Sequence, residues 1–293
     1  MKQEYELGAT QSVVPWSSGT RAPHFEVPPN ATDCHHHVYN SRFPSDPKTT
    51  MHPEDASVSD YKLLQKRLGT MRNVVVQPST YGLDNSALLE ALQRFGPKAT
   101  RGIAVVDTSV TDSELQQLHG AGVRGIRFNL RQKGSTTWEM LEALAQRIAG
   151  FNWHVQINAS AEHITAANDI WNRLPCQIVF DHLAHVPQPE GAEHPVFAII
   201  TELLHKGKAW VKLSGIYIDS KSGPPVYADV SAVAKSYVQQ APERLVWGSD
   251  WPHPTEQEKP DDAAILDLLA EWAPDEAIRH RILVENPANL YDF

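Results

Sequence analysis

The chain has 293 residues, of which 41% are hydrophobic and 21% charged, and 35 acidic against 26 basic side chains give a formal charge of −9. This acidic balance excludes the basic surface of a nucleic-acid-binding protein, and no apolar run reaches the roughly 18 residues of a membrane-spanning helix. Two cysteines cannot form a disulfide framework and the N-terminus carries no signal-like apolar stretch, so we expect a cytoplasmic protein without nucleic-acid or membrane partners.

The first part of the chain is rich in proline and small polar residues. Prolines recur from Pro15 to Pro29 among serines and glycines. This composition predicts an extended N-terminal arm over residues 1–30. The remaining residues, 31–293, are predicted to form one domain.

After the arm, short runs rich in valine and isoleucine recur, and each ends in polar or small residues. This pattern is typical of strands that are buried on both faces of a parallel sheet. The predicted strands are 31–38, 72–78, 101–106, 124–129, 153–158, 177–182, 209–214 and 244–249.

Between these strands, apolar residues recur at steps of three and four, which indicates amphipathic helices with one buried stripe. In one of them, Thr111 and Glu114 form a capping box and Gly120 supplies a C-terminal stop. The predicted helices are 84–94, 111–119, 137–149, 160–173, 195–205, 227–240 and 261–272.

Eight strands that alternate with helices imply parallel pairing with right-handed crossovers. Eight is also the number that closes a barrel of about 250 residues. A doubly wound open sheet would need a glycine-rich phosphate turn after its first strand, and here that strand ends in histidines. We therefore predict an α/β fold, an eight-stranded (β/α) TIM barrel.

The active site of such a barrel lies at the C-terminal ends of its strands. The first strand ends Asp33-Cys34-His35-His36-His37. Because side chains alternate along a strand, His35 and His37 should share one face and Cys34 and His36 the other. Two imidazoles facing the barrel interior are candidate metal ligands or hydrogen-bond donors.

The sixth and eighth strands end in further candidates. His182 follows the sixth strand at the rim of the same cavity, and His185 lies on the loop after it. Asp250 emerges after the eighth strand, where a carboxylate that faces histidines is the natural general base. Pro252 and Pro254 argue against a helix that Asp250 would cap.

The fourth strand carries Arg127 and Asn129 on one face, and Arg131 follows it. A guanidinium at the end of a barrel strand can bind a substrate carboxylate with two parallel hydrogen bonds. Further candidates for substrate contact are Ser79, Gln156, Asn158, His185 and Tyr217.

Three sequence motifs at these strand ends together resemble those of the amidohydrolase superfamily. They are His35-x-His37, Asp181-His182 and the run Gly248–His253. The likeness is greatest to the branch of 2-pyrone-4,6-dicarboxylate lactonase and related sugar-lactone enzymes, and it extends from about residue 31 to Tyr291. It implies a distorted eight-stranded barrel and lactone substrates. It also implies a catalytic set of His35, His37, His182 and Asp250, with Ser79, Arg127 and Arg131 holding an anionic substrate.

Metal-dependent members of that superfamily carry a lysine or glutamate on the fourth strand and a histidine near the end of the fifth. This chain has Arg127 on the fourth strand and Gln156 and Asn158 on the fifth. We therefore expect no metal cofactor. The alternative is a single zinc ion bound by His35, His37 and Asp250.

The expected partner is a small sugar-acid lactone. His185 and Tyr217 stand where the dicarboxylate lactonases tend to carry further arginines, which favours a substrate with one carboxylate and several hydroxyls. The resemblance favours conversion of D-galactaro-1,5-lactone into the 1,4-lactone by intramolecular acyl transfer in D-galacturonate catabolism. One alternative is a lactonase that hydrolyses a sugar-acid or pyrone dicarboxylate lactone. An alternative of another class is a non-catalytic sugar-acid binding protein.

Overall fold

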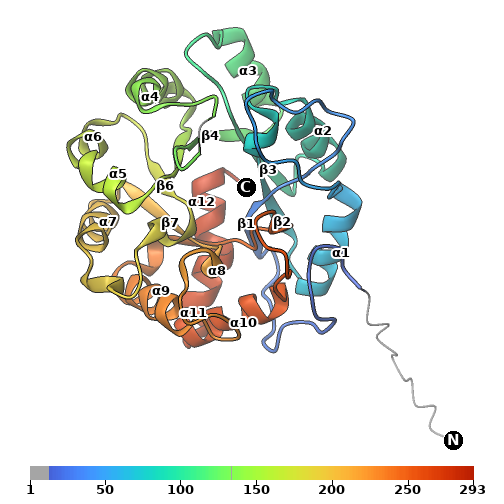
Figure 1. The fold of residues 1–293 in the computed structure, drawn as a ribbon, viewed down its shortest axis with the longest axis vertical. Coiled ribbons are helices and arrows are strands. Elements are labelled where there is room, and N and C mark those ends of the chain that lie inside the picture. Colours follow the sequence, from blue (N-terminus) through green and yellow to red (C-terminus); the bar gives the residue numbers. More distant parts are fainter. Residues whose placement is uncertain (1–12, 133) are drawn as a thin grey trace, which may run out of the picture.

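The computed structural model describes residues 13–132 and 134–293. Its eight strands are hydrogen-bonded in chain order and every neighbouring pair is parallel, so the predicted TIM barrel is confirmed (Figure 1). The strands are β1 (Thr32–His36), β2 (Arg72–Val76), β3 (Thr100–Ala104), β4 (Val123–Asn129), β5 (His154–Asn158), β6 (Ile178–Phe180), β7 (Ala209–Leu213) and β8 (Leu245–Trp247).

The barrel closes between β1 and the segment that follows β8. The amide of Asp250 donates to the carbonyl of His35 at 2.8 Å, and the amide of His37 donates to the carbonyl of Trp251 at 2.8 Å. Gly248 allows this approach, because a Cβ atom there would lie 2.7 Å from the Cβ atom of His35. The two predicted catalytic segments are thus held against each other by the backbone.

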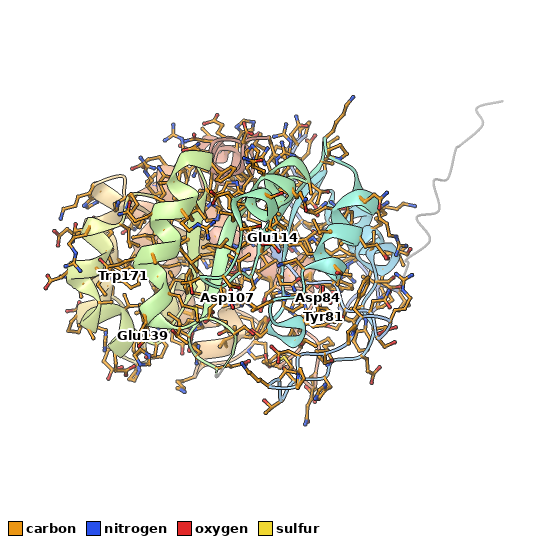
Figure 2. The ribbon with its side chains drawn as sticks, turned by 90° about the horizontal axis from the view of Figure 1, so that it is seen from above. Tyr81, Asp84, Asp107, Glu114, Glu139 and Trp171 are labelled. Carbon is orange, nitrogen blue, oxygen red and sulfur yellow. The ribbon has the colours of Figure 1, made fainter. Side chains whose placement is uncertain are left out.

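Helices surround the sheet, and Figure 2 shows them from above with Glu114 at the start of α3 and Trp171 on α6. The described residues form α1 (Val58–Leu68), α2 (Ser86–Phe95), α3 (Asp112–Gly120), α4 (Leu141–Ile148), α5 (Ala161–Ala166), α6 (Asn168–Arg173), α7 (Pro195–His205), α8 (Ile216–Asp219), α9 (Ala228–Gln240), α10 (Asp262–Trp272), α11 (Glu276–His280) and α12 (Asn286–Tyr291). No helix of the described chain is long and apolar enough to cross a membrane.

The helix predictions need two corrections. The helix predicted over 160–173 is two helices, because the backbone turns at Ala167 between α5 and α6. Gly120 is the last residue of α3, and the left-handed conformation follows at Gly122, whose φ is 103°. The capping box of Thr111 and Glu114 is confirmed.

The first strand also departs from simple alternation. Its register with β2 shifts between Asp33 and His36. Cys34 packs inside the barrel with Val74 and Val76, whereas His36 points outward and stacks on Tyr61 of α1. The predicted common face of Cys34 and His36 is therefore wrong, because a bulge inserts a residue at this point.

The predicted arm is described from residue 13 onward, and residues 1–12 lie outside the described part. Residues 13–30 run across α1 and α10 without forming a helix or strand of their own. Arg67 of α1 donates to the carbonyls of Ser18 and Gly19 at 3.1 and 2.8 Å, and Arg21 pairs with Asp267 of α10 at 2.6 Å. The division into an arm and a barrel domain stays a prediction.

Candidate active site

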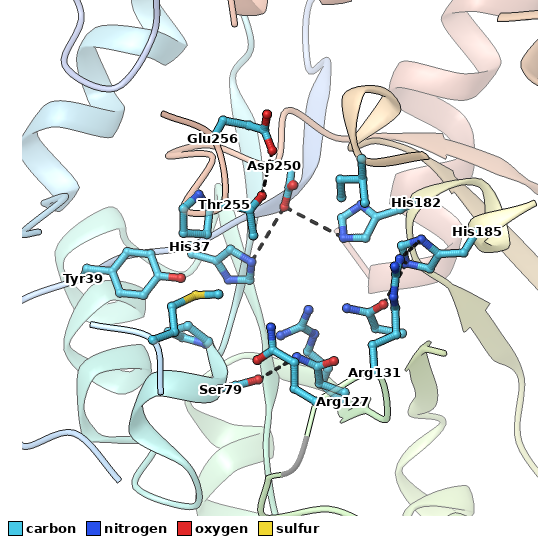
Figure 3. A pocket seen from close by; sticks show the side chains of 17 residues that line it. His37, Tyr39, Ser79, Arg127, Arg131, His182, His185, Asp250, Thr255 and Glu256 are labelled. Atoms are coloured by element: carbon cyan, nitrogen blue, oxygen red, sulfur yellow. Dashed lines mark hydrogen bonds and ion pairs between the residues drawn. The ribbon is translucent and has the colours of Figure 1, made fainter. Parts of the chain in front are cut away.

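A cavity of about 400 Å³ opens at the C-terminal ends of the strands (Figure 3). Figure 3 shows Asp250 between His37 and His182 on one side, with Ser79, Arg127 and Arg131 on the other. The predicted site residues that line it are His37, Ser79, Arg127, Arg131, Asn158, His182, His185 and Asp250.

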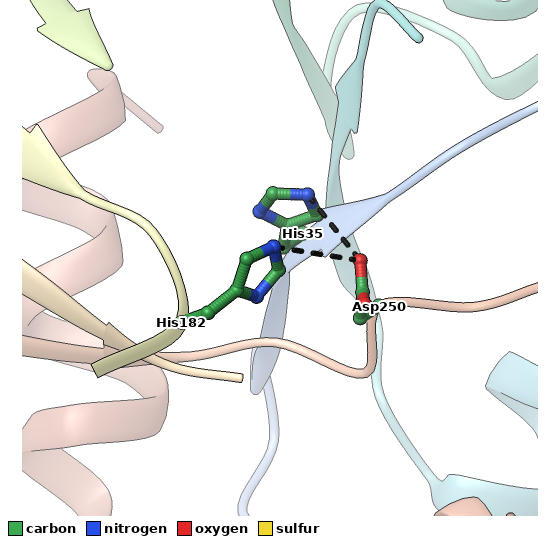
Figure 4. A group of neighbouring side chains, drawn as sticks. All are labelled: His35, His182 and Asp250. Atoms are coloured by element: carbon green, nitrogen blue, oxygen red, sulfur yellow. Dashed lines mark ion pairs between the residues drawn. The ribbon is translucent and has the colours of Figure 1, made fainter. Parts of the chain in front are cut away.

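One oxygen of Asp250 faces three imidazoles. The Nε2 atoms of His35, His37 and His182 lie 3.5, 3.8 and 4.0 Å from Asp250 Oδ1 (Figure 4 shows the first and the last). Burial by itself raises the pKa of Asp250, but the imidazoles of His182, His35 and His37 outweigh it and hold that pKa below the ordinary carboxyl value. Asp250 is therefore an ionised carboxylate at neutral pH.

The other oxygen of Asp250 is already occupied. The hydroxyl of Tyr217 donates to Asp250 Oδ2 at 2.7 Å. Only Oδ1 is left to exchange a proton with a molecule in the cavity. This division of the two oxygens makes Oδ1 the candidate proton acceptor of the site.

His182 is positioned by strained backbone. The four residues from His182 to His185 have φ angles of 49°, 53°, 59° and 49°, a left-handed turn that costs about 1–2 kcal/mol per residue. Ser214 Oγ lies 3.0 Å from His182 Nδ1, and a Cβ atom on Gly215 would lie 2.4 Å from that same nitrogen. Strain that is retained around a cavity-facing imidazole points to a functional role.

The imidazoles of His35 and His37 lie against each other at the end of the first strand. His37 Nδ1 lies 2.8 Å from the carbonyl oxygen of Val76, which can only accept, so this nitrogen carries the proton. His35 Nδ1 lies 3.2 Å from Asp181 Oδ1 and 3.3 Å from Lys212 Nζ, so it can donate to the carboxylate or accept from the ammonium. His35 Nε2 lies 3.3 Å from His37 Nε2 and faces Asp250.

Burial makes both of these imidazoles weak bases. It lowers the pKa of His35 well below its ordinary value, and the Lys212 charge lowers it further. Burial, with Arg127 nearby, lowers the pKa of His37 to about 4. A proton that either ring shares with the Asp250 carboxylate is therefore readily released.

Lys212 and Asp181 lie beneath the cavity. Lys212 is fully buried inside the barrel and donates to Gln156 Oε1 at 2.7 Å and to the carbonyl of Cys34 at 2.8 Å. Its ammonium is 3.6 Å from Asp181, and burial lowers its pKa to about 8. Lys212 was not among the predicted site residues. It could have been found from the sequence, because it is a lysine at an inward position of an otherwise apolar strand, Ala209–Leu213.

Three predicted site residues lie behind the cavity wall. His35 is fully buried and reaches the cavity only through His37 and Asp250. Gln156 is also fully buried, because it sits one inward position below Asn158 on β5 and faces Lys212. Tyr217 on α8 turns behind Asp250. Neither Gln156 nor Tyr217 lines this cavity, so the substrate contacts expected of them stay a prediction.

The opposite wall carries two guanidiniums, each with a carboxylate neighbour. Arg127 Nε is 3.5 Å from Asp181 Oδ2, and Arg131 is 3.6 Å from Asp219 Oδ1. His185 joins the second pair, with its Nδ1 2.6 Å from Asp219. This wall can still receive a carboxylate, but part of its charge is already balanced.

Amide and hydroxyl groups complete the wall. Asn129 Nδ2 donates to Ser79 Oγ at 2.8 Å, and Asn158 Oδ1 lies 2.8 Å from His185 Nε2. Glu256, on the segment after β8, also lines the cavity. Asn129 and Glu256 were not selected from the sequence as site residues. Asn129 could have been selected, because it lies on the same face of β4 as Arg127. Glu256 could not, because a loop has no periodic pattern that shows which side chains face the cavity.

Residues 32–293 match the family model described as amidohydrolase. The chain belongs to the amidohydrolase family. It is 37% identical to a 2-pyrone-4,6-dicarboxylate hydrolase of Comamonas testosteroni, with 94% of each chain covered. It is 34% identical to a 4-sulfomuconolactone hydrolase of Rhizobium radiobacter (97% of this chain and 99% of the relative) and 32% identical to a D-galactarolactone isomerase of Agrobacterium fabrum (94% of each).

Among solved structures, an Agrobacterium tumefaciens protein superimposes with a TM-score of 0.88 at 30% identity, covering 95% of this chain and 98% of that one. The sequence motifs at the ends of strands one, six and eight predicted a resemblance to the amidohydrolases. The comparisons confirm it for the amidohydrolase family and its lactonase-like branch.

Amidohydrolases raise the question of a metal ion. His35, His182 and Asp250 offer ligand atoms within 4.8 Å of one another. The donor atoms lie at a spacing that a metal ion can use, whereas the positive charges of Lys212 and Arg127, which lie close to His35 and His37, oppose a divalent cation there.

Proposed function

We propose that this amidohydrolase is an enzyme that acts on the lactone of a hydroxylated acid, and that Asp250 is its general base. The observation that carries the proposal is the convergence of three imidazole nitrogens on Asp250 Oδ1, at 3.5 to 4.0 Å, beside a cavity whose other wall holds guanidiniums. A base next to anion-binding groups is what attack on a lactone carbonyl requires. The curated relatives, each named for a lactone reaction, support the same chemistry.

The charge of the cavity favours a substrate with a single carboxylate. Arg127 and Arg131 are each partly neutralised by a buried or half-buried carboxylate. Asp250 and Glu256 add two more negative groups to the wall. A dicarboxylate lactone would be repelled by this arrangement, whereas one carboxylate can bind at Arg131 while amide and hydroxyl groups bind substrate hydroxyls.

These features favour rearrangement of D-galactaro-1,5-lactone into the 1,4-lactone. The 4-hydroxyl attacks the lactone carbonyl, the bond to the ring oxygen breaks, and one proton passes from the attacking oxygen to the leaving oxygen. Asp250 Oδ1 takes that proton and returns it, and His182 and Arg127 stabilise the developing oxyanion. The attacking group is tethered, so an effective molarity of roughly 10⁵ M is available without a bound water.

Hydrolysis is the second candidate, favoured by the two relatives named as hydrolases at 37% and 34% identity. The same base would then activate a water molecule. Turnover of galactaro-1,5-lactone in ¹⁸O-labelled water separates the two reactions. Rearrangement gives an unlabelled 1,4-lactone, and hydrolysis gives a labelled carboxylate. Turnover of 2-pyrone-4,6-dicarboxylate with none of the galactarolactone would refute the substrate assignment.

We also propose that the reaction needs no metal. Activity should survive prolonged dialysis against a chelator, and added zinc should not raise it. Loss of activity on chelation with recovery on one equivalent of zinc would overturn this part of the proposal and would place the ion among His35, His37, His182 and Asp250.

A further inference from the structure

A buried row of four polar side chains runs away from the cavity behind Asp250. Tyr217 of α8 touches Asp250 Oδ2 at 2.7 Å on one side and His253 Nδ1 at 2.8 Å on the other. His253 Nε2 is 3.2 Å from Asp262, the first residue of α10. His253 and Asp262 are both fully buried. The row therefore links the candidate base to a carboxylate outside the cavity.

One assignment of protons satisfies all three contacts while Asp250 and Asp262 are both carboxylates. The Asp262 carboxylate can only accept, so His253 Nε2 carries a proton. Asp250 Oδ2 also accepts, so the single hydroxyl proton of Tyr217 points to it. The proton between Tyr217 and His253 then sits on His253 Nδ1. In this assignment His253 is doubly protonated, an imidazolium paired with Asp262.

The surroundings agree with a cation at His253. In the described chain, Asp262 has no side-chain partner other than His253, and a buried carboxylate without a cation is costly. Glu256 lies close enough to Tyr217 to raise its pKa further, whereas Lys259, which donates to the backbone carbonyl of His253, is a like charge that acts against the imidazolium. Ser17 Oγ accepts from the amide of Asp262.

We propose that Tyr217, His253 and Asp262 form a charge relay that acts on Asp250. They are positioning residues: the relay places a cation behind Asp250, keeps it ionised and reserves Oδ2, so that proton exchange occurs at Oδ1 among the imidazoles.

The assignment rests on the proposed role of Asp250, and its first test needs no turnover. Protein labelled with ¹⁵N-histidine should give one imidazolium signal near pH 7.5 with both ring nitrogens protonated, absent from the His253→Gln variant. The Asp262→Asn variant should lose the imidazolium character of that signal. A neutral His253 ring in the unmodified protein would overturn the relay, whether or not any lactone is turned over.

The second test measures kinetics in three variants. Tyr217→Phe removes both contacts and should lower kcat by about 10- to 100-fold with KM within about threefold. It should also move the acid limb of kcat/KM to higher pH, because Asp250 loses a donor. His253→Gln should act in the same direction, and the double variant should be no slower than Tyr217→Phe.

Tyr227→Phe is the matched control, because Tyr227 lies on the wall of the neighbouring cavity that Tyr217 also lines. It should leave kcat and the pH profile unchanged. Multiplicative losses in the double variant, or a folded Tyr217→Phe variant with the original pH profile, would show separate structural contributions and refute the relay. Lack of lactone turnover in the unmodified protein, together with an imidazolium signal, would refute the substrate assignment alone.

Discussion

Two buried histidines inside the same barrel show how differently one residue type is used at its two ends. His154 begins β5 near the floor, packs against the ring of Tyr291, and neither of its ring nitrogens has a hydrogen-bond partner among the described residues. His182 stands at the mouth, bonded to Ser214 and directed at Asp250. At the floor an imidazole fills space, whereas at the mouth each is oriented by a partner.

The difference extends to the other interior groups. Next to His154 at the floor, Tyr291 belongs to a packed interior cluster with Val74, Trp210 and Val246. Toward the mouth the interior becomes a network of charges and hydrogen bonds centred on Lys212. Conservation of packing at the bottom and of chemistry at the top is the general design of such barrels. Substitutions at the two ends should therefore have separable effects.

The largest effect is expected at the mouth, from Asp250→Asn. The amide cannot accept the proton of the attacking hydroxyl, so kcat should fall by about 10² to 10⁴. Substrate affinity should change little, because the guanidinium wall is intact. Steady-state kinetics and calorimetric titration measure the two quantities. Unmeasurable turnover in the unmodified protein, with tight sugar-acid binding in both, would instead favour a binding protein.

The next largest effect is expected between mouth and floor, from Lys212→Met. Removal of the ammonium leaves the Gln156 oxygen and the Cys34 carbonyl without this donor and takes a cation away from Asp181, and breaking a buried ion pair costs about 3–5 kcal/mol. Urea unfolding should show that loss, and the folded fraction should lose activity because the groups beneath His35 are no longer held in place. Lys206→Met, at an exposed pair with Glu202, should cost less than about 1 kcal/mol. Equal losses in the two variants would contradict the assigned role of Lys212.

Lys212 also marks the boundary of what the sequence could predict. The eight strands could be predicted, because each follows from a local pattern of apolar residues. The convergence of His37, His182 and Asp250 could also be predicted, because all three follow C-terminal strand ends, which meet at one end of a barrel. The partners of Lys212 were not, because they lie up to 178 positions away in the sequence and depend on barrel register. The bulge in β1 was equally hidden, since an inserted residue leaves no periodic signal.

Tyr217 shows the same limit in a loop. Gly215 has a φ of 57°, which turns the chain so that α8 carries Tyr217 behind Asp250 instead of into the cavity. Because such a turn decides which side chains of a loop face the cavity, the orientation of Tyr217 could not be predicted from the sequence. Helix α1, in contrast, could have been predicted, because Ser57 and Asp60 form a capping box before a regular apolar stripe.

A smaller effect at the mouth is expected from Asp219→Asn. This change removes the carboxylate next to Arg131, so the guanidinium should bind a substrate carboxylate more tightly and KM should fall by about 2- to 10-fold. Arg131→Gln should raise KM by a comparable or larger factor, with little change in kcat. Initial-rate kinetics with the same lactone tests both. A KM that rises in both variants would show that Asp219 holds Arg131 in place instead of competing with the substrate.

The smallest effect at neutral pH is expected at the floor, from His154→Leu. Activity should be unchanged, and stability at pH 7 should be equal or slightly higher, because two unpaired buried nitrogens are removed. Burial, reinforced by Lys212, lowers the pKa of His154 to about 3 in the folded protein, below the value of about 6.5 expected in an unfolded chain. Between these values the unfolded state binds more protons, so acidification from pH 6.5 towards 3 destabilises the fold by up to about 1.4 kcal/mol per pH unit for this histidine.

The leucine variant should therefore lose stability less steeply on acidification, although His36 and His37 contribute a slope of the same sign. Urea unfolding at pH 7, 5.5 and 4.5 measures the slope, and His52→Leu, at an exposed position, should reproduce that of the unmodified protein. An unchanged slope in His154→Leu would mean that the floor histidine is protonated in the folded state. It would then need a partner in the floor, and the contrast with the mouth would disappear.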